Sequence, residues 1–138
     1  MQYRPKHFKV YELVDPKTYK DRGIKAWELL DPKLLRLIDT LRETFGSATI
    51  NDWKWGGKFK WSGLRTSECK IGAKYSQHRF GRAADLKFRH ISPADIRKAI
   101  RKDKVYFQEM GVTCIENKTA TWLHIDVRNC DPIKWVNP

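Results

Sequence analysis

Cysteine is scarce in this sequence, and the few cysteines show no paired spacing. The chain contains only Cys69, Cys114 and Cys130, an odd number without a CxxC motif. This pattern argues against a disulfide framework and excludes a zinc knuckle built from cysteine pairs. We therefore expect all three side chains to be reduced, partly buried thiols.

Long apolar segments are absent as well. No hydrophobic run approaches the length of a bilayer-spanning helix, and residues 1–6 lack the apolar stretch of a secretory signal peptide. These absences predict a protein that is synthesised in a cytoplasm without a signal peptide and without a transmembrane segment.

Acidic residues are few relative to basic ones. The chain has 16 Asp and Glu against 28 Lys and Arg, which gives a formal net charge of +12. A surplus of this size indicates an anionic partner such as nucleic acid, acidic lipid head groups or a polyanionic cell wall. Charge alone does not choose among these partners, and a basic surface without a specific partner is the alternative.

The rest of the composition is that of a folded protein. Its 138 residues are 41% hydrophobic and include six tryptophans. This length is sufficient for one hydrophobic core and too short for two, so we expect a single domain over residues 1–138.

Capping residues and alternating patterns predict the secondary structure. Asp31 followed by Pro32 begins one apolar-periodic helix, and Ser92 followed by Pro93 begins another. Strand patterns cover residues 47–52, 82–88, 112–116 and 121–128. The last two are expected to form a hairpin joined by a short Asn-Lys-Thr-Ala connection. Helices and strands mix without a βαβ rhythm, so we predict an α+β fold, a small antiparallel sheet with helices packed mainly on one face.

Two histidines and a carboxylate follow one another in an order that suits a metal site. His78 and Asp85 lie seven residues apart, and His124 follows about forty residues later. Two imidazoles and one carboxylate supply three ligands to zinc and leave one position open for water, as in catalytic zinc sites. Asp85 and His124 fall on predicted strands, and pairing of those strands would bring the two side chains together. Singly, each is more typical of a core or ion-pair residue, but the ordered pattern favours ligands.

The residues around these ligands resemble a known family. The string Ser76-x-His78-x-x-Gly81-x-Ala83-x-Asp85, with the later Trp122-x-His124, is similar to the LAS-type zinc peptidases. These comprise D-Ala-D-Ala carboxypeptidases and dipeptidases, and the L-alanyl-D-glutamate endopeptidases of bacteriophage endolysins. The segment Ser62-Gly63-Leu64-Arg65 resembles the Ser-Gly-Tyr-Arg element of the same family. The resemblance covers about residues 50–128, within a motif-bearing core of about 48–128.

The resemblance implies a fold, a cofactor and a site. It implies a hedgehog/D-Ala-D-Ala-peptidase-like fold in which His78, Asp85 and His124 hold Zn2+. It also implies that Arg65 contacts a substrate carboxylate, for which a planar guanidinium is suited. Ser76 and Gln77 either donate hydrogen bonds near the scissile carbonyl or stabilise the turn that precedes the strand at residues 82–88.

The resemblance also implies a substrate and a setting. We expect a peptidase, either a carboxypeptidase or an endopeptidase, that cleaves the stem peptides of bacterial peptidoglycan. We expect it to be phage-encoded, as an endolysin or a virion-associated lysin that acts at the cell wall. The basic surface would contact anionic wall polymers or lipids, without specific nucleic-acid binding, and the expected state is a monomer.

One position departs from the family pattern and leaves the general base open. The family commonly carries Glu or Asp three residues before the second histidine ligand, where this chain has Thr121. A hydrolytic metal site needs a carboxylate to move a proton, and Glu116 and Asp126 are the candidates. An odd hairpin loop centred on Ala120 would set Glu116 opposite His124, whereas an even loop would turn it to the other face. Glu116 is favoured as base, and Asp126 is expected to orient a ligand imidazole.

The missing carboxylate supports a second hypothesis. A non-catalytic phage tail or baseplate component, or a cell-wall-binding module on the same scaffold, would need no general base. A third hypothesis, nucleic-acid binding through the basic face, predicts affinity that falls steeply with salt and does not depend on His78 or His124.

Overall fold

The computed structural model describes residues 2–138. Its α-helices are α1 (Pro16–Arg22), α2 (Pro32–Phe45), α3 (Pro93–Lys102) and α4 (Lys104–Met110). Its strands are β1 (Ala48–Thr49), β2 (Ala83–Phe88), β3 (Cys114–Glu116), β4 (Leu123–Asp126) and β5 (Lys134–Val136). Short 3-10 helices occupy Val10–Glu12, Gly23–Leu29, Trp53–Trp55 and Gln77–Phe80.

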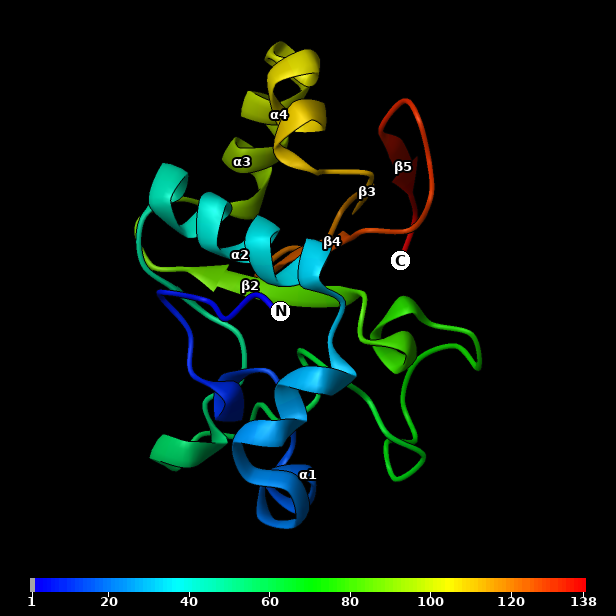
Figure 1. Cartoon of the computed structure of the whole chain (residues 1–138). Helices are drawn as coiled ribbons and strands as arrows, with labels where there is room; N and C mark the ends of the chain where they lie inside the picture. Colours follow the sequence, from blue (N-terminus) through cyan, green and yellow to red (C-terminus); the bar gives the residue numbers. More distant parts are fainter. Residues whose placement is uncertain (1) are drawn as a thin grey trace.

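The five strands form one sheet in the order β1-β2-β4-β3-β5. Every pair is antiparallel except β3 and β5, which are parallel. Figure 1 shows α2 lying over β2, with α3 and α4 above this pair in the view and the N-terminal segment and α1 below it. The predicted α+β fold with a small, mostly antiparallel sheet is therefore confirmed.

Two strand predictions differ from the structure. The segment 47–52 forms a strand only at Ala48–Thr49, because the backbone N–H of Asn51 donates to the carbonyl of Glu12 instead of to the sheet. The sheet also gains β5, which pairs Lys134 with Cys114. A three-residue edge strand is too short to show an alternating pattern, so the sequence alone did not indicate it.

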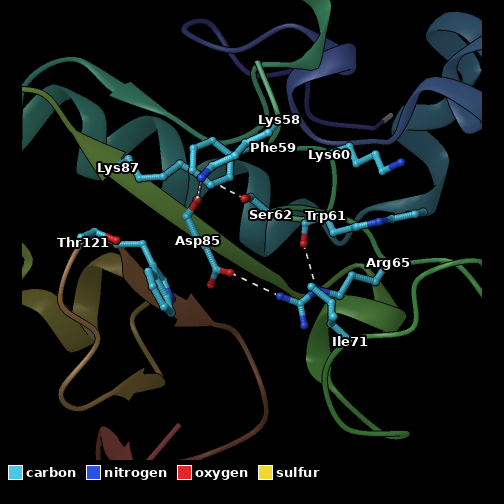
Figure 2. A pocket seen from close by; sticks show the side chains of 11 residues that line it. Lys58, Phe59, Lys60, Trp61, Ser62, Arg65, Ile71, Asp85, Lys87 and Thr121 are labelled. Carbon is cyan, nitrogen blue, oxygen red and sulfur yellow. Dashed lines mark hydrogen bonds and ion pairs between the residues drawn. The ribbon is translucent and has the colours of Figure 1, made fainter. Parts of the chain in front are cut away.

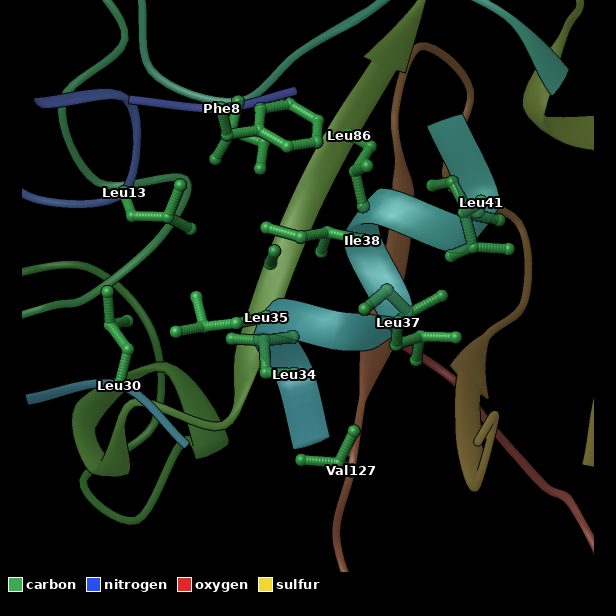
Figure 3. Close-up of a cluster of buried hydrophobic side chains, with 14 of the residues drawn as sticks. Phe8, Leu13, Leu30, Leu34, Leu35, Leu37, Ile38, Leu41, Leu86 and Val127 are labelled. Carbon is green, nitrogen blue, oxygen red and sulfur yellow. The ribbon is translucent and has the colours of Figure 1, made fainter. Parts of the chain in front are cut away.

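The helix α2 covers the apolar face of the sheet. Asp31 caps it by accepting a 2.9 Å hydrogen bond from the Lys33 N–H, as the capping pattern predicts. Figure 3 shows apolar side chains of this helix, among them Leu35 and Ile38, in one cluster with Leu86 of β2. The fully buried side chains of this helix are Leu34, Leu35, Leu37, Ile38 and Leu41. Since strand side chains alternate, burial of Leu86 turns its neighbours Asp85 and Lys87 to the other face, where the functional site forms.

Truncation in this core is expected to be costly. Ile38 is fully buried, so Ile38→Ala should lower the free energy of unfolding by about 2–5 kcal/mol, because it removes buried methyl groups and leaves a cavity. Urea denaturation followed by circular dichroism measures this. Lys33→Ala, on the exposed side of the same helix, is the control and should shift stability little. Equal effects of the two substitutions would contradict the placement of α2.

The remaining expectations from composition concern thiols and membranes. All three cysteines are free, with Cys69 and Cys114 buried. Within residues 2–138, none of the helices combines the length and the apolar character that crossing a bilayer requires.

Candidate metal centre

The strands β2 and β4 bring two of the candidate ligands together. The register of this pair sets Asp85 directly opposite His124, on the face of the sheet away from α2. The Nδ1 atom of His124 lies 2.9 Å from Oδ1 of Asp85. Both residues are largely buried, at 9% and 5% exposure, and both line the wall of a cavity.

The third candidate, His78, comes from the 3-10 helix Gln77–Phe80 that leads into β2. Its Nε2 atom lies 3.3 Å from the same Asp85 oxygen. One atom each from His78, Asp85 and His124 lie within 4.8 Å of one another, a group that is able to hold a metal ion. The structure thus brings the three sequence-predicted ligands to one point.

Two glycines make this arrangement sterically feasible. Gly81 ends the 3-10 helix with φ of +69°, and a Cβ there would lie 2.0 Å from the carbonyl oxygen of Leu29. A Cβ on Gly63 would lie 2.3 Å from the carbonyl oxygen of Leu13. Both positions therefore require a residue without a side chain. These glycines allow the turn that carries His78 and the loop before it to pack against neighbouring backbone.

Hydrogen bonds on the far side of each ring orient the two imidazoles. His78 Nδ1 lies 2.8 Å from the carbonyl oxygen of Gly63, and His124 Nε2 lies 3.1 Å from Oδ2 of Asp126. With the ring proton on each of these nitrogens, the other nitrogen of each ring would be left free to bind a metal ion beside Asp85. Two neutral imidazole nitrogens and one carboxylate oxygen are a donor set that fits zinc.

The electrostatics of the cluster favour positive charge between its carboxylates. Burial acts to raise the pKa of Asp85, but hydrogen bonds from His124 and His78 outweigh it and hold that pKa well below its usual range. Burial likewise acts to lower the pKa of His124, but hydrogen bonds to Asp126 and Asp85 raise it to about 9. A cation is therefore stabilised at this point, which suits a metal site.

Asp126 lies behind His124 and does not point into the ligand cluster. Its side chain is fully buried, and Arg128 donates to both of its oxygens, at 2.8 Å from Nε and 2.6 Å from Nη2. Burial acts to raise the pKa of Asp126, but hydrogen bonds from His124 and Arg128 lower it. A carboxylate that favours its charged form in this position is placed to orient the imidazole of His124.

Glu116, in contrast, lies beside the ligand atoms. The register of β3 with β4 pairs Ile115 with Ile125, and one residue further along it sets Glu116 opposite His124, the arrangement that an odd loop produces. Its Oε1 atom lies 3.8 Å from His124 Nδ1, and its side chain is 23% exposed. Glu116, His78 and His124 line one cavity of about 440 Å3, which we call the Glu116 cavity. Glu116 therefore has both access to solvent and proximity to the cluster.

The three predicted substrate-binding residues differ in their hydrogen bonds. Arg65 reaches the cluster, with Nη2 3.5 Å from Oδ2 of Asp85 and Nε donating to the carbonyl of Trp61 at 2.8 Å. The Ser76 hydroxyl accepts from the His78 N–H at 3.3 Å, so it stabilises the turn. Gln77 lines the Glu116 cavity, and its Oε1 atom is buried without a hydrogen-bond partner among the described residues. A buried free acceptor of this kind is suited to an N–H group of a bound peptide.

Lys87 was not among the predicted site residues, although it shares a strand face with Asp85. Its ammonium donates to the carbonyl of Ile50 at 2.5 Å and to the hydroxyl of Ser62 at 2.8 Å. Burial lowers the pKa of Lys87 to about 8. The spacing of two residues from Asp85 could have indicated that Lys87 lies on the same face of the strand. How deeply its side chain is buried depends on the loop that covers it.

Replacement of Asp126 should weaken metal binding without unfolding the protein. Asp126→Asn keeps the shape of the side chain but removes the charge that orients His124, and loss of such a partner costs about 10–100-fold in metal affinity. Competition with a chromophoric zinc chelator measures the change, and Asp95→Asn, on the exposed side of α3, is the control. An unchanged affinity would show that Asp126 does not support the ligand.

Two imidazoles and a carboxylate around an accessible point, with a second carboxylate at hand, form a site of the mononuclear metallopeptidase type. The chain belongs to the peptidase M15 family, whose model matches residues 6–126. The match confirms the resemblance to zinc peptidases and extends well before the motif-bearing core. No curated protein and no solved structure matches the chain.

Proposed function

We propose that this protein is a zinc-dependent peptidase that hydrolyses peptide bonds in the stem peptides of bacterial peptidoglycan. The main support is the convergence of His78, Asp85 and His124, with the Glu116 carboxylate 3.8 Å from Nδ1 of His124. Membership of a family of zinc-dependent peptidases supports the same conclusion. The proposed ligands are these three side chains, and the proposed base is Glu116.

Each proposed residue has one role in the reaction. A zinc ion held by the three ligands supplies Lewis acidity at the scissile carbonyl. Glu116 takes a proton from the attacking water at Oε1 and gives it to the leaving amine nitrogen. Asp126 keeps His124 in the tautomer that leaves Nδ1 unprotonated, and Gln77 Oε1 accepts an N–H of the bound peptide. Arg65 attracts the carboxylate end of the substrate.

The proposed setting is that of a phage lysin, free or carried in the virion, that acts at the cell wall as a monomer. The resemblance to phage L-alanyl-D-glutamate endopeptidases supports this setting. The net charge of +12 supports retention of the enzyme on anionic wall polymers or lipid head groups. Such retention would weaken as salt screens the charges.

Digestion of purified peptidoglycan tests the proposed function. The zinc-loaded protein should release new amino groups, and mass spectrometry of the products should identify one cleaved stem bond. A chelator should abolish the release, and added zinc should restore it. Intact stem peptides after prolonged incubation with zinc-loaded protein would contradict the proposal and favour the non-catalytic wall-binding module that Thr121 suggests.

A further inference from the structure

A second cavity adjoins the candidate metal centre, and three lysines lie in its lining. Figure 2 shows side chains that line this cavity, which we call the lysine cavity. Its volume is about 420 Å3. Its lining includes Lys58, Phe59, Lys60, Trp61, Lys87 and Thr121. The lysine cavity and the Glu116 cavity share Arg65, Asp85 and Trp122 as wall residues. A peptide that occupies both cavities therefore passes over the candidate ligands.

The charge of the lysine cavity calls for an anionic ligand. Four basic side chains line it, namely Lys58, Lys60, Arg65 and Lys87. The one carboxylate in its wall is Asp85, which already contacts His78 and His124. The cavity thus carries an excess of positive charge beside the reacting bond, and opposite charges attract across it.

Lys87 is the one lysine that the fold holds at a fixed place in this cavity. Its ammonium contacts the neutral oxygens of Ile50 and Ser62 and lies 4.1 Å from the centre of the Phe59 ring. Within residues 2–138, no carboxylate comes within ion-pair distance of it. Its third contact, 3.5 Å to the carbonyl of Asp85, is the longest of the three, so it is the one that a ligand would displace.

Thr121 helps to keep the lysine cavity positively charged. It lines the lysine cavity, whereas Glu116 lines only the other one. A carboxylate at position 121, as in the family pattern, would place negative charge against Lys87 and Arg65 and compete with an anionic ligand. With threonine at this position and the carboxylate supplied by Glu116 instead, the lysine cavity keeps its positive charge for the substrate.

We propose that the lysine cavity binds a carboxylate of the substrate next to the scissile bond, with Lys87 as the specificity-determining residue. This inference rests on the proposed function, because it assumes a peptide across the metal centre. Two sources supply the same chemistry: the terminal carboxylate of a peptide, and the free carboxylate of an acidic residue within it. In either case, conversion of that carboxylate to a carboxamide removes the charge that Lys87 recognises.

Matched synthetic stem peptides test the proposal. One pair differs in a terminal carboxylate or amide, and the other pair differs in a free or amidated internal acidic residue. We expect one of these amidations to lower kcat/KM about 10-fold to 100-fold, the range for loss of a charged hydrogen bond. The pair that shows the effect identifies the source of the carboxylate. Calorimetry with the zinc-loaded Glu116→Gln variant should show the same preference in the dissociation constant.

Substitutions then assign the preference to the cavity. Lys87→Met should remove the discrimination between the paired peptides, and Lys98→Met, on the exposed side of α3, should leave it intact. Thr121→Glu should also reduce it, and this exposed position provides the test should Lys87→Met fail to fold. An undiminished preference in the folded variants, or no preference in either peptide pair, overturns the proposal.

The two proposals fail in different ways. Cleavage of all four peptides at similar rates overturns the carboxylate site and leaves the peptidase standing. Binding of the carboxylate forms without any cleavage overturns the proposed function, and a Lys87-dependent preference in that binding supports the carboxylate site. Absence of both cleavage and binding overturns the two proposals together.

Discussion

Glu116→Gln is expected to lower kcat for stem-peptide hydrolysis by about 10²–10⁴-fold, the contribution of a positioned general base. The amide keeps the size of the side chain but cannot accept the proton of the attacking water. Zinc content and folding should be unchanged, because Glu116 lies beside the cluster and is not among the three grouped ligand atoms. Initial rates on purified peptidoglycan fragments measure the effect.

The controls separate this role from general effects of charge. Glu109→Gln, at an exposed position of α4, should retain full activity. Asp126→Asn should recover much of its activity at saturating zinc, because it acts through His124. Near-normal turnover by Glu116→Gln, combined with loss of turnover in zinc-saturated Asp126→Asn, would reverse the assignment of the base.

Asp85→Asn is expected to abolish both zinc retention and activity. It removes the one anionic donor of the cluster, and the neutral amide no longer compensates the charge of a divalent cation. Activity should fall to the level of the chelator-treated wild type. Metal analysis after gel filtration, together with the peptidoglycan assay, measures both losses.

The control for this substitution lies outside the site. Asp95→Asn, exposed near the start of α3, should retain one zinc per chain and normal rates. A folded Asp85→Asn protein that still hydrolyses stem peptides at the wild-type rate would show that the metal centre is not where the reaction occurs.

The parts of the fold that the sequence predicted best are those set by local chemistry. Asp31–Pro32 and Ser92–Pro93 cap α2 and α3 as expected, since side-chain caps depend only on adjacent residues. The alternation along β2 and β4 put Asp85 and His124 on faces that a paired sheet could join. The convergence of the three candidate ligands followed from these local features and one strand pairing.

The parts that could not be predicted depend on register and on distant segments. The length of the 117–122 connection determines the face of the sheet on which Glu116 lies. A connection one residue longer or shorter would have placed Glu116 on the other face. The partners of Lys87, the carbonyl of Ile50 and the hydroxyl of Ser62, come from segments 37 and 25 residues away. Such contacts are decided by tertiary packing, for which a single sequence carries no periodic signal.

X-ray absorption spectroscopy of the zinc-loaded protein tests the central claim most directly. The account predicts one zinc per chain bound by two imidazole nitrogens and by oxygen donors, with the imidazole signal reduced in His78→Ala and in His124→Ala. It also predicts that one oxygen donor is water and that Glu116→Gln leaves the spectrum unchanged. A zinc ion enclosed by a fourth protein ligand, or a spectrum unaffected by loss of either histidine, would contradict it.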